Sequence, residues 1–234
     1  MITLYTYPYL YGLADNNPYG LKVVAFLRLC GLSYRQEHII DVHDAPRGQL
    51  PYILDGSTVI GDSDLIIAHL IRQHRLPIDG DLSEAERRID HMIRRTLDDL
   101  YWVMSYSRWS DPRFWPLFRD QLLNTHPDIT EALLEAARQY NLKRYHFQGI
   151  GRYETGQIYS RGLTDLEVIA GTLADRPFLF GATPHSIDTA LMGFLPNIYR
   201  YEIDTPLRAF VAAQPNLTDF CRRTAPLVSL APSA

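Results

Sequence analysis

The chain has 234 residues, of which 46% are hydrophobic and 21% are charged, and its formal net charge is −4. These fractions lie close to the average of globular proteins, which excludes a disordered or collagen-like chain. The mildly acidic balance disfavours nucleic acid as a partner, because phosphate binding requires clustered positive charge. At this length we expect one large or two modest domains, and no disulfide or metal is needed to stabilise the fold.

The cysteines and the apolar segments indicate where the protein is expected to reside. Cys30 and Cys221 are far apart in the chain, so neither a CxxC redox pair nor a zinc-ligand spacing is present. We expect no signal peptide, because no basic residue precedes Lys22 and Asp15 interrupts the first apolar stretch. The apolar runs are far shorter than the ~20 residues of a membrane span. These features favour a cytoplasmic protein without a membrane span.

The first third of the chain alternates between strand and helix patterns. The Asp55-Gly56 pair supplies the positive φ of a tight turn between the third and fourth predicted strands. The order of elements predicts a small mixed sheet with helices on its faces, its first two strands parallel and its last two antiparallel. The predicted strands are residues 2–7, 33–40, 52–54 and 58–60, and the predicted helices are residues 19–30 and 62–73.

The chain becomes helical after Pro77. Ser83 and Glu86 have the spacing of a capping box, in which two side chains cap the start of a helix reciprocally. We therefore expect two domains, an α/β domain at residues 1–76 and an all-α domain at residues 83–234. The predicted helices of the second domain are residues 83–109, 114–123, 129–140, 155–174, 186–199, 206–213 and 217–223.

Three strings in chain order resemble segments of the glutathione S-transferase superfamily. APRGQLPYI at residues 45–53 resembles N-P-x-G-x-V-P, and GDSDLI at residues 61–66 resembles E-S-x-x-I, with Asp in place of Glu. PFLFG at residues 177–181, followed by Asp188, resembles the start of the core helix in the second domain of these proteins. His185 stands where that helix usually has Ser or Thr, so its capping box lacks the usual first residue.

The resemblance covers nearly the whole chain. The run at residues 98–109 and the string DAP at residues 44–46 look closest to the branch of failed axon connections and metaxin proteins. The superfamily implies a thioredoxin-like N-terminal domain and an all-α C-terminal bundle. It also implies glutathione as co-substrate, an electrophile as second substrate and a homodimer.

The resemblance implies a glutathione site at the edge of the sheet. The Leu50–Pro51 peptide bond is expected to be cis, and the main chain of Leu50 to bind the cysteinyl backbone of glutathione like an added strand. On local sequence alone, Pro51 fits an ordinary loop proline ahead of a strand. Ser63 is expected to bind the γ-glutamyl carboxylate at a helix start, where the dipole favours an anion. Asp62 is expected near the γ-glutamyl amine and equally fits a plain N-cap, and Gln49 is a candidate for the glycine end.

The group that activates the thiol is the point where the sequence departs from the superfamily. Relatives use Tyr, Ser or Cys near the first helix, because a free thiol with a pKa of ~8.5 is only slightly ionised at neutral pH. Asn17 stands where relatives carry Ser or Cys. Its amide can donate a hydrogen bond to a thiolate but cannot form a mixed disulfide. Asn17 fits a plain helix N-cap equally well. Tyr7 is the second candidate and Tyr19 the third, because a neutral phenol with a pKa of ~10 can also donate.

An aromatic stripe marks the first long helix of the second domain. Trp102, Tyr106 and Trp109 share one face at helical spacing, and Tyr101 lies beside it. In the superfamily this helix lines the pocket for the electrophile, whereas such a stripe is also typical of a packed core. Since no HExxH or paired histidine pattern occurs, we expect no metal site.

These patterns favour a glutathione transferase that directs the bound thiolate at an apolar electrophile between the two domains. One alternative is a non-catalytic binding or scaffold protein of the same fold, which the residue at position 17 supports. Another is a glutathione-dependent isomerase or dehalogenase, which would share the thiolate and differ only in the second pocket.

Overall fold

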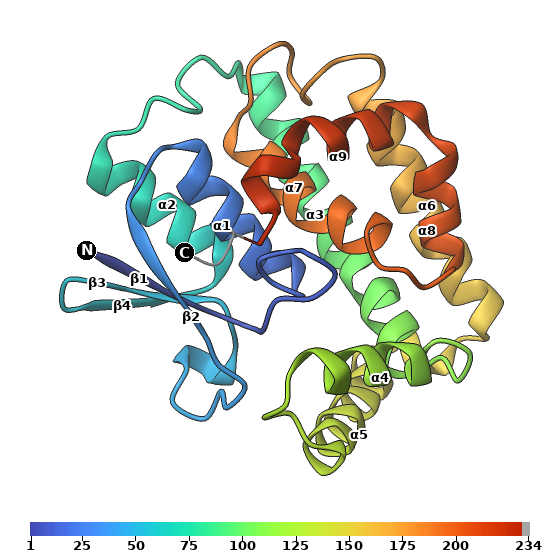
Figure 1. Ribbon diagram of the computed structural model, residues 1–234. Coiled ribbons are helices and arrows are strands. Elements are labelled where there is room, and N and C mark those ends of the chain that lie inside the picture. Colours follow the sequence, from blue (N-terminus) through green and yellow to red (C-terminus); the bar gives the residue numbers. More distant parts are fainter. Residues whose placement is uncertain (231–234) are drawn as a thin grey trace.

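The computed structural model describes residues 1–230 (Figure 1). A small α/β part is followed by an all-helical part, and this confirms the predicted fold class. The first part consists of β1 (Ile2–Thr6), α1 (Pro18–Leu29), β2 (Tyr34–His38), the 3-10 helix η1 (Pro46–Gly48), β3 (Tyr52–Asp55), β4 (Thr58–Gly61) and α2 (Ser63–His74). The second part consists of α3 (Glu84–Trp109), α4 (Trp115–Thr125), α5 (Glu131–Gln148), the 3-10 helix η2 (Ile150–Arg152), α6 (Thr155–Leu173), α7 (Ser186–Tyr199), α8 (Pro206–Ala213) and α9 (Pro215–Val228).

The four strands form one mixed sheet in the order β2-β1-β3-β4. β1 pairs in parallel with β2 and antiparallel with β3, and β3 pairs antiparallel with β4, as predicted. Leu4 on β1 lies between Gln36 and Ile53, and both Leu4 and Ile53 are completely buried. The α1 and α2 helices lie together on one side of the sheet (Figure 1).

Helix α1 is buried on nearly all sides, between the sheet and the helical part. It packs directly on α7, and Gly193 makes this close approach possible. A Cβ atom at position 193 would lie 2.2 Å from the carbonyl oxygen of Pro18 and 3.0 Å from the amide nitrogen of Lys22. One hydrophobic core continues from the sheet through α1 into the helical part. Two candidate residues, Asn17 and Tyr19, lie at the N-terminus of α1. Their position therefore depends on the packing of α1 against α7.

Most helix boundaries agree with the sequence pattern within one or two residues, and α5 and α9 are longer than predicted. Helix α5 continues through the polar residues 141–148 and ends at Gly149, whose φ of 111° suits the left-handed end of a helix. Helix α9 covers Pro215–Val228 and so extends beyond the predicted segment, residues 217–223, at both ends. Within residues 1–230, no helix combines the length and the apolar character needed to cross a bilayer.

Only half of the reciprocal cap forms at the start of α7. The carboxylate of Asp188 accepts hydrogen bonds from the backbone N–H of His185 and of Leu179, both at 2.8 Å. The imidazole of His185 does not cap the helix and lies 3.1 Å from Asp81 instead. Burial raises the pKa of Asp188 to about 6, although both N–H donors oppose the shift.

Candidate functional site

A cavity of about 540 Å³ lies where the start of β3, the N-terminus of α2 and helix α3 meet. It brings together all the residues predicted to bind glutathione, together with part of the predicted aromatic stripe. The lining residues are Tyr19, Arg47, Gln49, Leu50, Pro51, Asp62, Ser63, Asp64, Leu65, Arg95, Asp98, Tyr101, Trp102 and Arg144.

The segment before β3 presents unpaired main-chain groups to this cavity. The Leu50–Pro51 peptide bond is cis, as the resemblance implies. The carbonyl of Pro51 accepts a hydrogen bond from the N–H of Asp62 at 3.3 Å. No residue in the described part of the chain hydrogen-bonds to the N–H or the carbonyl of Leu50. A peptide ligand could therefore pair with both groups in the manner of a β-strand.

The N-terminus of α2 forms the neighbouring wall of the cavity. Oδ1 of Asp62 accepts hydrogen bonds from the N–H groups of Asp64 at 3.0 Å and Leu65 at 3.2 Å, so Asp62 is the N-cap. Its φ of 80° is costly for a residue with a side chain, and such backbone strain is often found at functional sites. The hydroxyl of Ser63 has no hydrogen-bond partner among residues 1–230. A free hydroxyl at the positive end of a helix suits a carboxylate.

A partly buried ion network joins α1, α2 and α3 beside the cavity. Asp64 Oδ1 lies 2.6 Å from Lys22 Nζ and 2.5 Å from Arg94 Nη1. Arg94 also pairs with Asp90 at 2.9 Å. Burial alone would raise the pKa of Asp64, but Lys22 and Arg94 outweigh it and hold the pKa below its usual value. The network ties the α2 N-terminus to the helix that carries the aromatic side chains.

The three candidate thiol activators differ in which hydrogen-bonding groups remain free. Asn17 caps α1, since its Oδ1 accepts the N–H of Tyr19 at 3.0 Å, while its amide NH2 has no partner within residues 1–230. The hydroxyl of Tyr19 lines the cavity but donates to Asp98 at 2.9 Å. Burial raises the pKa of Tyr19, and Asp98 and Tyr101 raise it further. The proton of Tyr19 is therefore already engaged by a carboxylate.

Neither Asn17 nor Tyr7 lines the cavity, but Tyr7 lies close to Tyr101 and Arg144, which do. Burial raises the pKa of Tyr7, Tyr101 and Asp15 act in the same direction, and Arg144 opposes them. The Tyr7 side chain makes no hydrogen bond within the described chain. A phenol in this state is protonated at neutral pH and can act as a hydrogen-bond donor.

The structure divides the predicted aromatic stripe. Tyr101 and Trp102 line the cavity. Tyr106 is 8% exposed, and its hydroxyl lies 3.0 Å from Thr155 Oγ1. The Trp109 ring stacks on Trp115, with 5.4 Å between the ring centroids. Tyr106 and Trp109 do not line this cavity, because α4 and α6 cover the later turns of α3: Tyr106 is buried, and Trp109 is partly buried and packs against the core.

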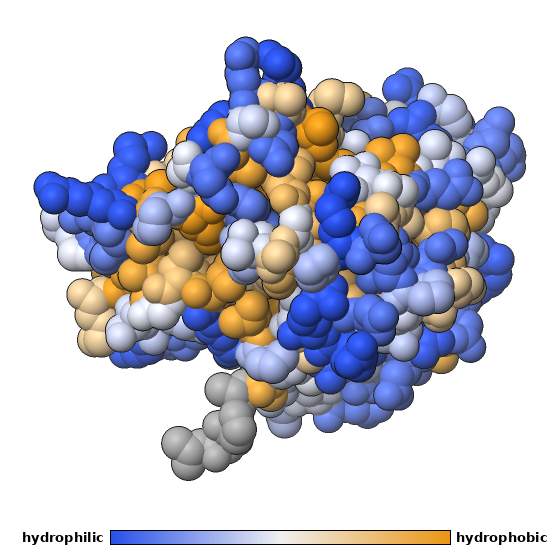
Figure 2. Space-filling model, turned by 90° about the horizontal axis from the view of Figure 1, so that it is seen from above, coloured by the Kyte–Doolittle hydropathy of each residue, from blue (hydrophilic) through white to orange (hydrophobic). Residues whose placement is uncertain are grey.

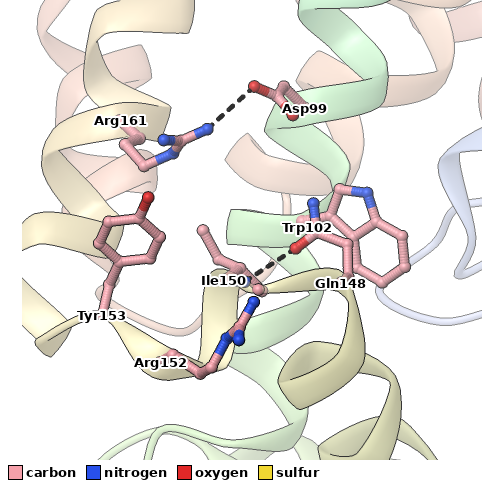
Figure 3. Close-up of a pocket in the computed structure, with 8 residues that line it drawn as sticks. Asp99, Trp102, Gln148, Ile150, Arg152, Tyr153 and Arg161 are labelled. Atoms are coloured by element: carbon pink, nitrogen blue, oxygen red, sulfur yellow. Dashed lines mark hydrogen bonds and ion pairs between the residues drawn. The ribbon is translucent and has the colours of Figure 1, made fainter.

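A second cavity of about 380 Å³ lies beside Trp102 (Figure 3). Figure 3 shows the indole beside Gln148 on one wall, with Tyr153 and Arg161 on the opposite wall. Arg161 pairs with Asp99 at 3.2 Å, and both side chains are about half exposed. Trp102 lines both cavities, so its indole contributes to two walls.

Sequence reasoning identified Asp62 but none of the other charged side chains of the first cavity. Arg144 lies in the last part of α5, beyond the predicted end of that helix, where polar residues gave no apolar periodicity. Asp98 and Arg95 lie one turn before the aromatic stripe and pair with each other at 3.1 Å. In residues 1–230, no group of three or more His, Cys, Asp or Glu side chains is arranged to hold a metal ion.

Comparison with known proteins agrees with this arrangement. The model of the glutathione S-transferase N-terminal domain matches residues 18–114, and that of the C-terminal domain matches residues 162–224. The chain is 30% identical to the isoprene-epoxide–glutathione S-transferase of Rhodococcus sp. (strain AD45), over 95% of this chain and 97% of that protein. It is 28% identical to Failed axon connections of Drosophila melanogaster, over 88% of this chain and 52% of that protein.

A solved structure shares the same fold. The glutathione S-transferase of Methylobacterium radiotolerans, in complex with glutathione sulfonate, superposes with a TM-score of 0.65 at 15% identity, over 100% of this chain and 97% of that one. The predicted thioredoxin-like architecture and the resemblance to the failed axon connections branch are thereby confirmed. Since family models match both parts of the chain and a transferase matches almost all of it, this chain belongs to the glutathione S-transferase family.

Proposed function

We propose that this chain is an active glutathione transferase that binds glutathione in the 540 Å³ cavity and directs its thiolate at an electrophile held against α3. One observation carries the proposal: a single cavity gathers every residue predicted to bind glutathione. The unpaired main chain of Leu50 and the free hydroxyl of Ser63 give that cavity the polar groups that a tripeptide needs.

Each part of glutathione has a matching group in the cavity. Leu50 beside Pro51 pairs with the cysteinyl backbone, and Ser63 at the α2 N-terminus binds the γ-glutamyl carboxylate. Asp62 lies nearest the γ-glutamyl amine, and Gln49 binds the glycine end. The ion pair between Arg47 and Asp62, at 3.1 Å, joins the two walls at this point.

The reaction is nucleophilic attack by the thiolate. The sulfur forms a bond to the electrophilic carbon, the bond to the leaving group breaks, and the leaving group keeps the electron pair. The amide NH2 of Asn17 is our first candidate for the donor that stabilises the thiolate, and the hydroxyl of Tyr7 is the second. Tyr19 ranks third, because its proton is held by Asp98. Tyr101 and Trp102 provide the aromatic wall for the electrophile.

The Rhodococcus relative supports epoxides as one class of electrophile, since its name assigns it isoprene epoxide. With an epoxide, the sulfur bonds to a ring carbon, the carbon–oxygen bond breaks, and the oxygen takes a proton. Conjugation of such compounds fits a role in detoxification.

Isothermal titration with glutathione tests the binding step, and conjugation of a panel of electrophiles tests the chemistry. We expect Asn17→Ala and Tyr7→Phe to lower kcat, while the control Tyr153→Phe, on the second cavity, leaves it unchanged. Equal rates in all variants would refute the assignment of the donors. An absence of heat and of thermal stabilisation at millimolar glutathione would refute the proposed function.

A non-catalytic binding protein of the same fold is the second candidate. Two observations favour it: the capping role of Asn17, which explains that residue without chemistry, and the similarity to Failed axon connections. Glutathione binding without conjugation of any electrophile in the panel would support it. A glutathione-dependent isomerase or dehalogenase would share the thiolate, and product analysis separates it from a transferase.

We also propose that the protein is a cytoplasmic homodimer with a domain boundary between residues 76 and 83. Apolar side chains are exposed on β4, α2 and α3, where Val59 is 54%, Leu65 57% and Met92 66% exposed. Hydrophobic residues also gather on the half of the molecule that contains the sheet (Figure 2). Large exposed apolar areas commonly mark protein contacts. Light scattering measures the mass in solution.

A further inference from the structure

Arg144 differs from the other arginines that line the first cavity. Arg47 pairs with Asp62 at 3.1 Å, and Arg95 pairs with Asp98 at 3.1 Å. Within residues 1–230, no carboxylate oxygen lies within 4.0 Å of the Arg144 guanidinium. An arginine is always charged at neutral pH and offers five N–H donors, so this side chain brings an uncompensated positive charge to the cavity.

Aromatic rings hold the guanidinium in place. Its central carbon lies 5.0 Å from the centroid of Trp102 and 5.6 Å from that of Tyr140. One donor, Nη1, reaches the side-chain oxygen of Asn141 at 3.2 Å. Cation–π contacts position an arginine without neutralising its charge or using its N–H donors. The Tyr101 hydroxyl also lies close enough to interact with the guanidinium. The other N–H donors have no partner among residues 1–230 and can bind a ligand with planar acceptor oxygens, such as a carboxylate.

The wall that carries Arg144 is the one assigned to the electrophile. Trp102 and Tyr101 line this side of the cavity, whereas the residues proposed to hold glutathione come from the segment before β3 and the start of α2. Both carboxylates of glutathione already have partners there, Ser63 at one end and the Gln49 region at the other. Arg144 therefore remains available for an anion that does not belong to glutathione.

We infer that Arg144 binds a carboxylate of the second substrate, so that this protein prefers electrophiles that carry a carboxylate on a planar body able to stack on Trp102. The inference rests on the proposed function for the placement of glutathione. It makes Arg144 a specificity-determining residue that contacts the electrophile and takes no part in activating the thiol.

The test compares two electrophiles that differ in one ring substituent, a charged carboxylate in 4-chloro-3-nitrobenzoate and a neutral amide in 4-chloro-3-nitrobenzamide. In both, the glutathione sulfur bonds to the ring carbon that carries chlorine, and chloride leaves with the electron pair. We expect Arg144→Gln to lower kcat/KM for the benzoate about tenfold or more, the size of a lost charged hydrogen bond, and to change the benzamide less than twofold. Arg144→Lys should retain part of the preference, and Lys143→Gln, which removes an exposed charge from the next position, should change neither substrate.

A parallel loss for both substrates in Arg144→Gln would overturn the inference, because the side chain would then act on folding or on the thiol. Loss of glutathione affinity in the same variant would also overturn it, since Arg144 would then belong to the glutathione site. If the wild-type protein conjugates neither compound, titration of the two into the protein saturated with S-methylglutathione decides. Preferential binding of the benzoate that Arg144→Gln abolishes supports the inference, and equal binding overturns it. A failure to bind glutathione at all is a separate result that refutes the proposed function.

Discussion

The substitution Gly193→Ala tests the contact that holds α1 in place. The added methyl would lie 2.2 Å from the Pro18 carbonyl oxygen, whereas ordinary contacts begin near 3.4 Å, so the two helices must separate by about 1 Å. Both partners at the contact are backbone or buried atoms, and neither can rotate away. Overpacking of a core lowers the free energy of unfolding by about 1–3 kcal/mol, and we expect the upper end of this range for Gly193→Ala. For a chain of this length that lowers Tm by roughly 6–12 °C.

The assay is chemical and thermal denaturation, with Gly171→Ala as the matched control. Gly171 lies on α6, is exposed, and has no heavy atom within 4 Å of the position that a Cβ would occupy. The same substitution there should stabilise the protein by about 0.5–1 kcal/mol, since alanine favours the helical backbone. Opposite signs at the two glycines support the reasoning. If Gly193→Ala lowered the free energy of unfolding by less than about 1 kcal/mol, α1 and α7 would pack less closely than described.

Five further substitutions address the site and its surroundings. Ser63→Ala should weaken glutathione binding by about tenfold in isothermal titration, through loss of a hydrogen bond to a charged group; unchanged affinity would remove Ser63 from the site. Asp64→Asn should lower the free energy of unfolding at pH 7 by about 2–3 kcal/mol, less than for a fully buried pair because the Asp64 side chain is 38% exposed. Since its pKa is held below the ordinary value, this stabilisation is present above about pH 4 and is lost as the pH falls further, so urea unfolding at pH 3 should show a smaller difference. Trp102→Ala should raise KM for aromatic electrophiles with little change in glutathione affinity, whereas Trp109→Ala should lower the unfolding free energy by about 2 kcal/mol or more without affecting KM. Asn17→Ser keeps a good helix cap, so stability should change by less than about 0.5 kcal/mol and any change in kcat reports on the chemistry at that position.

The order of the elements could be predicted from sequence because each depends on local rules. Asp55-Gly56 fixes the hairpin turn, and the capping box of Ser83 with Glu86 is present as predicted. The extension of α5 could not be predicted in the same way, since residues 141–148 are polar and offer no apolar stripe. Tertiary contacts support that helix, among them the buried hydrogen bond between Tyr145 and Ser105 at 2.7 Å.

The candidate site was predictable on one wall and not on the other. Pro51 and Ser63 belong to short strings in which backbone geometry limits the residue type, so they stand out in a single sequence. Arg144 and Tyr106 show the opposite case. Both lie on helices where any long side chain fits, and only the packing of α5 and α6 against α3 decides that one reaches the cavity while the other is buried.

This division has a physical consequence for specificity. The proposed glutathione wall consists largely of main-chain groups and a helix end, which tolerate changes in neighbouring side chains because the backbone supplies the contacts. The opposite wall consists of side chains on α3 and α5, held by ring contacts and ion pairs, so single substitutions there alter the ligand that fits. A change from Arg144 to a neutral residue leaves the backbone of both walls intact and removes one charge. Under the proposed function, selection for a different electrophile can therefore act on α5 while the binding of glutathione stays constant.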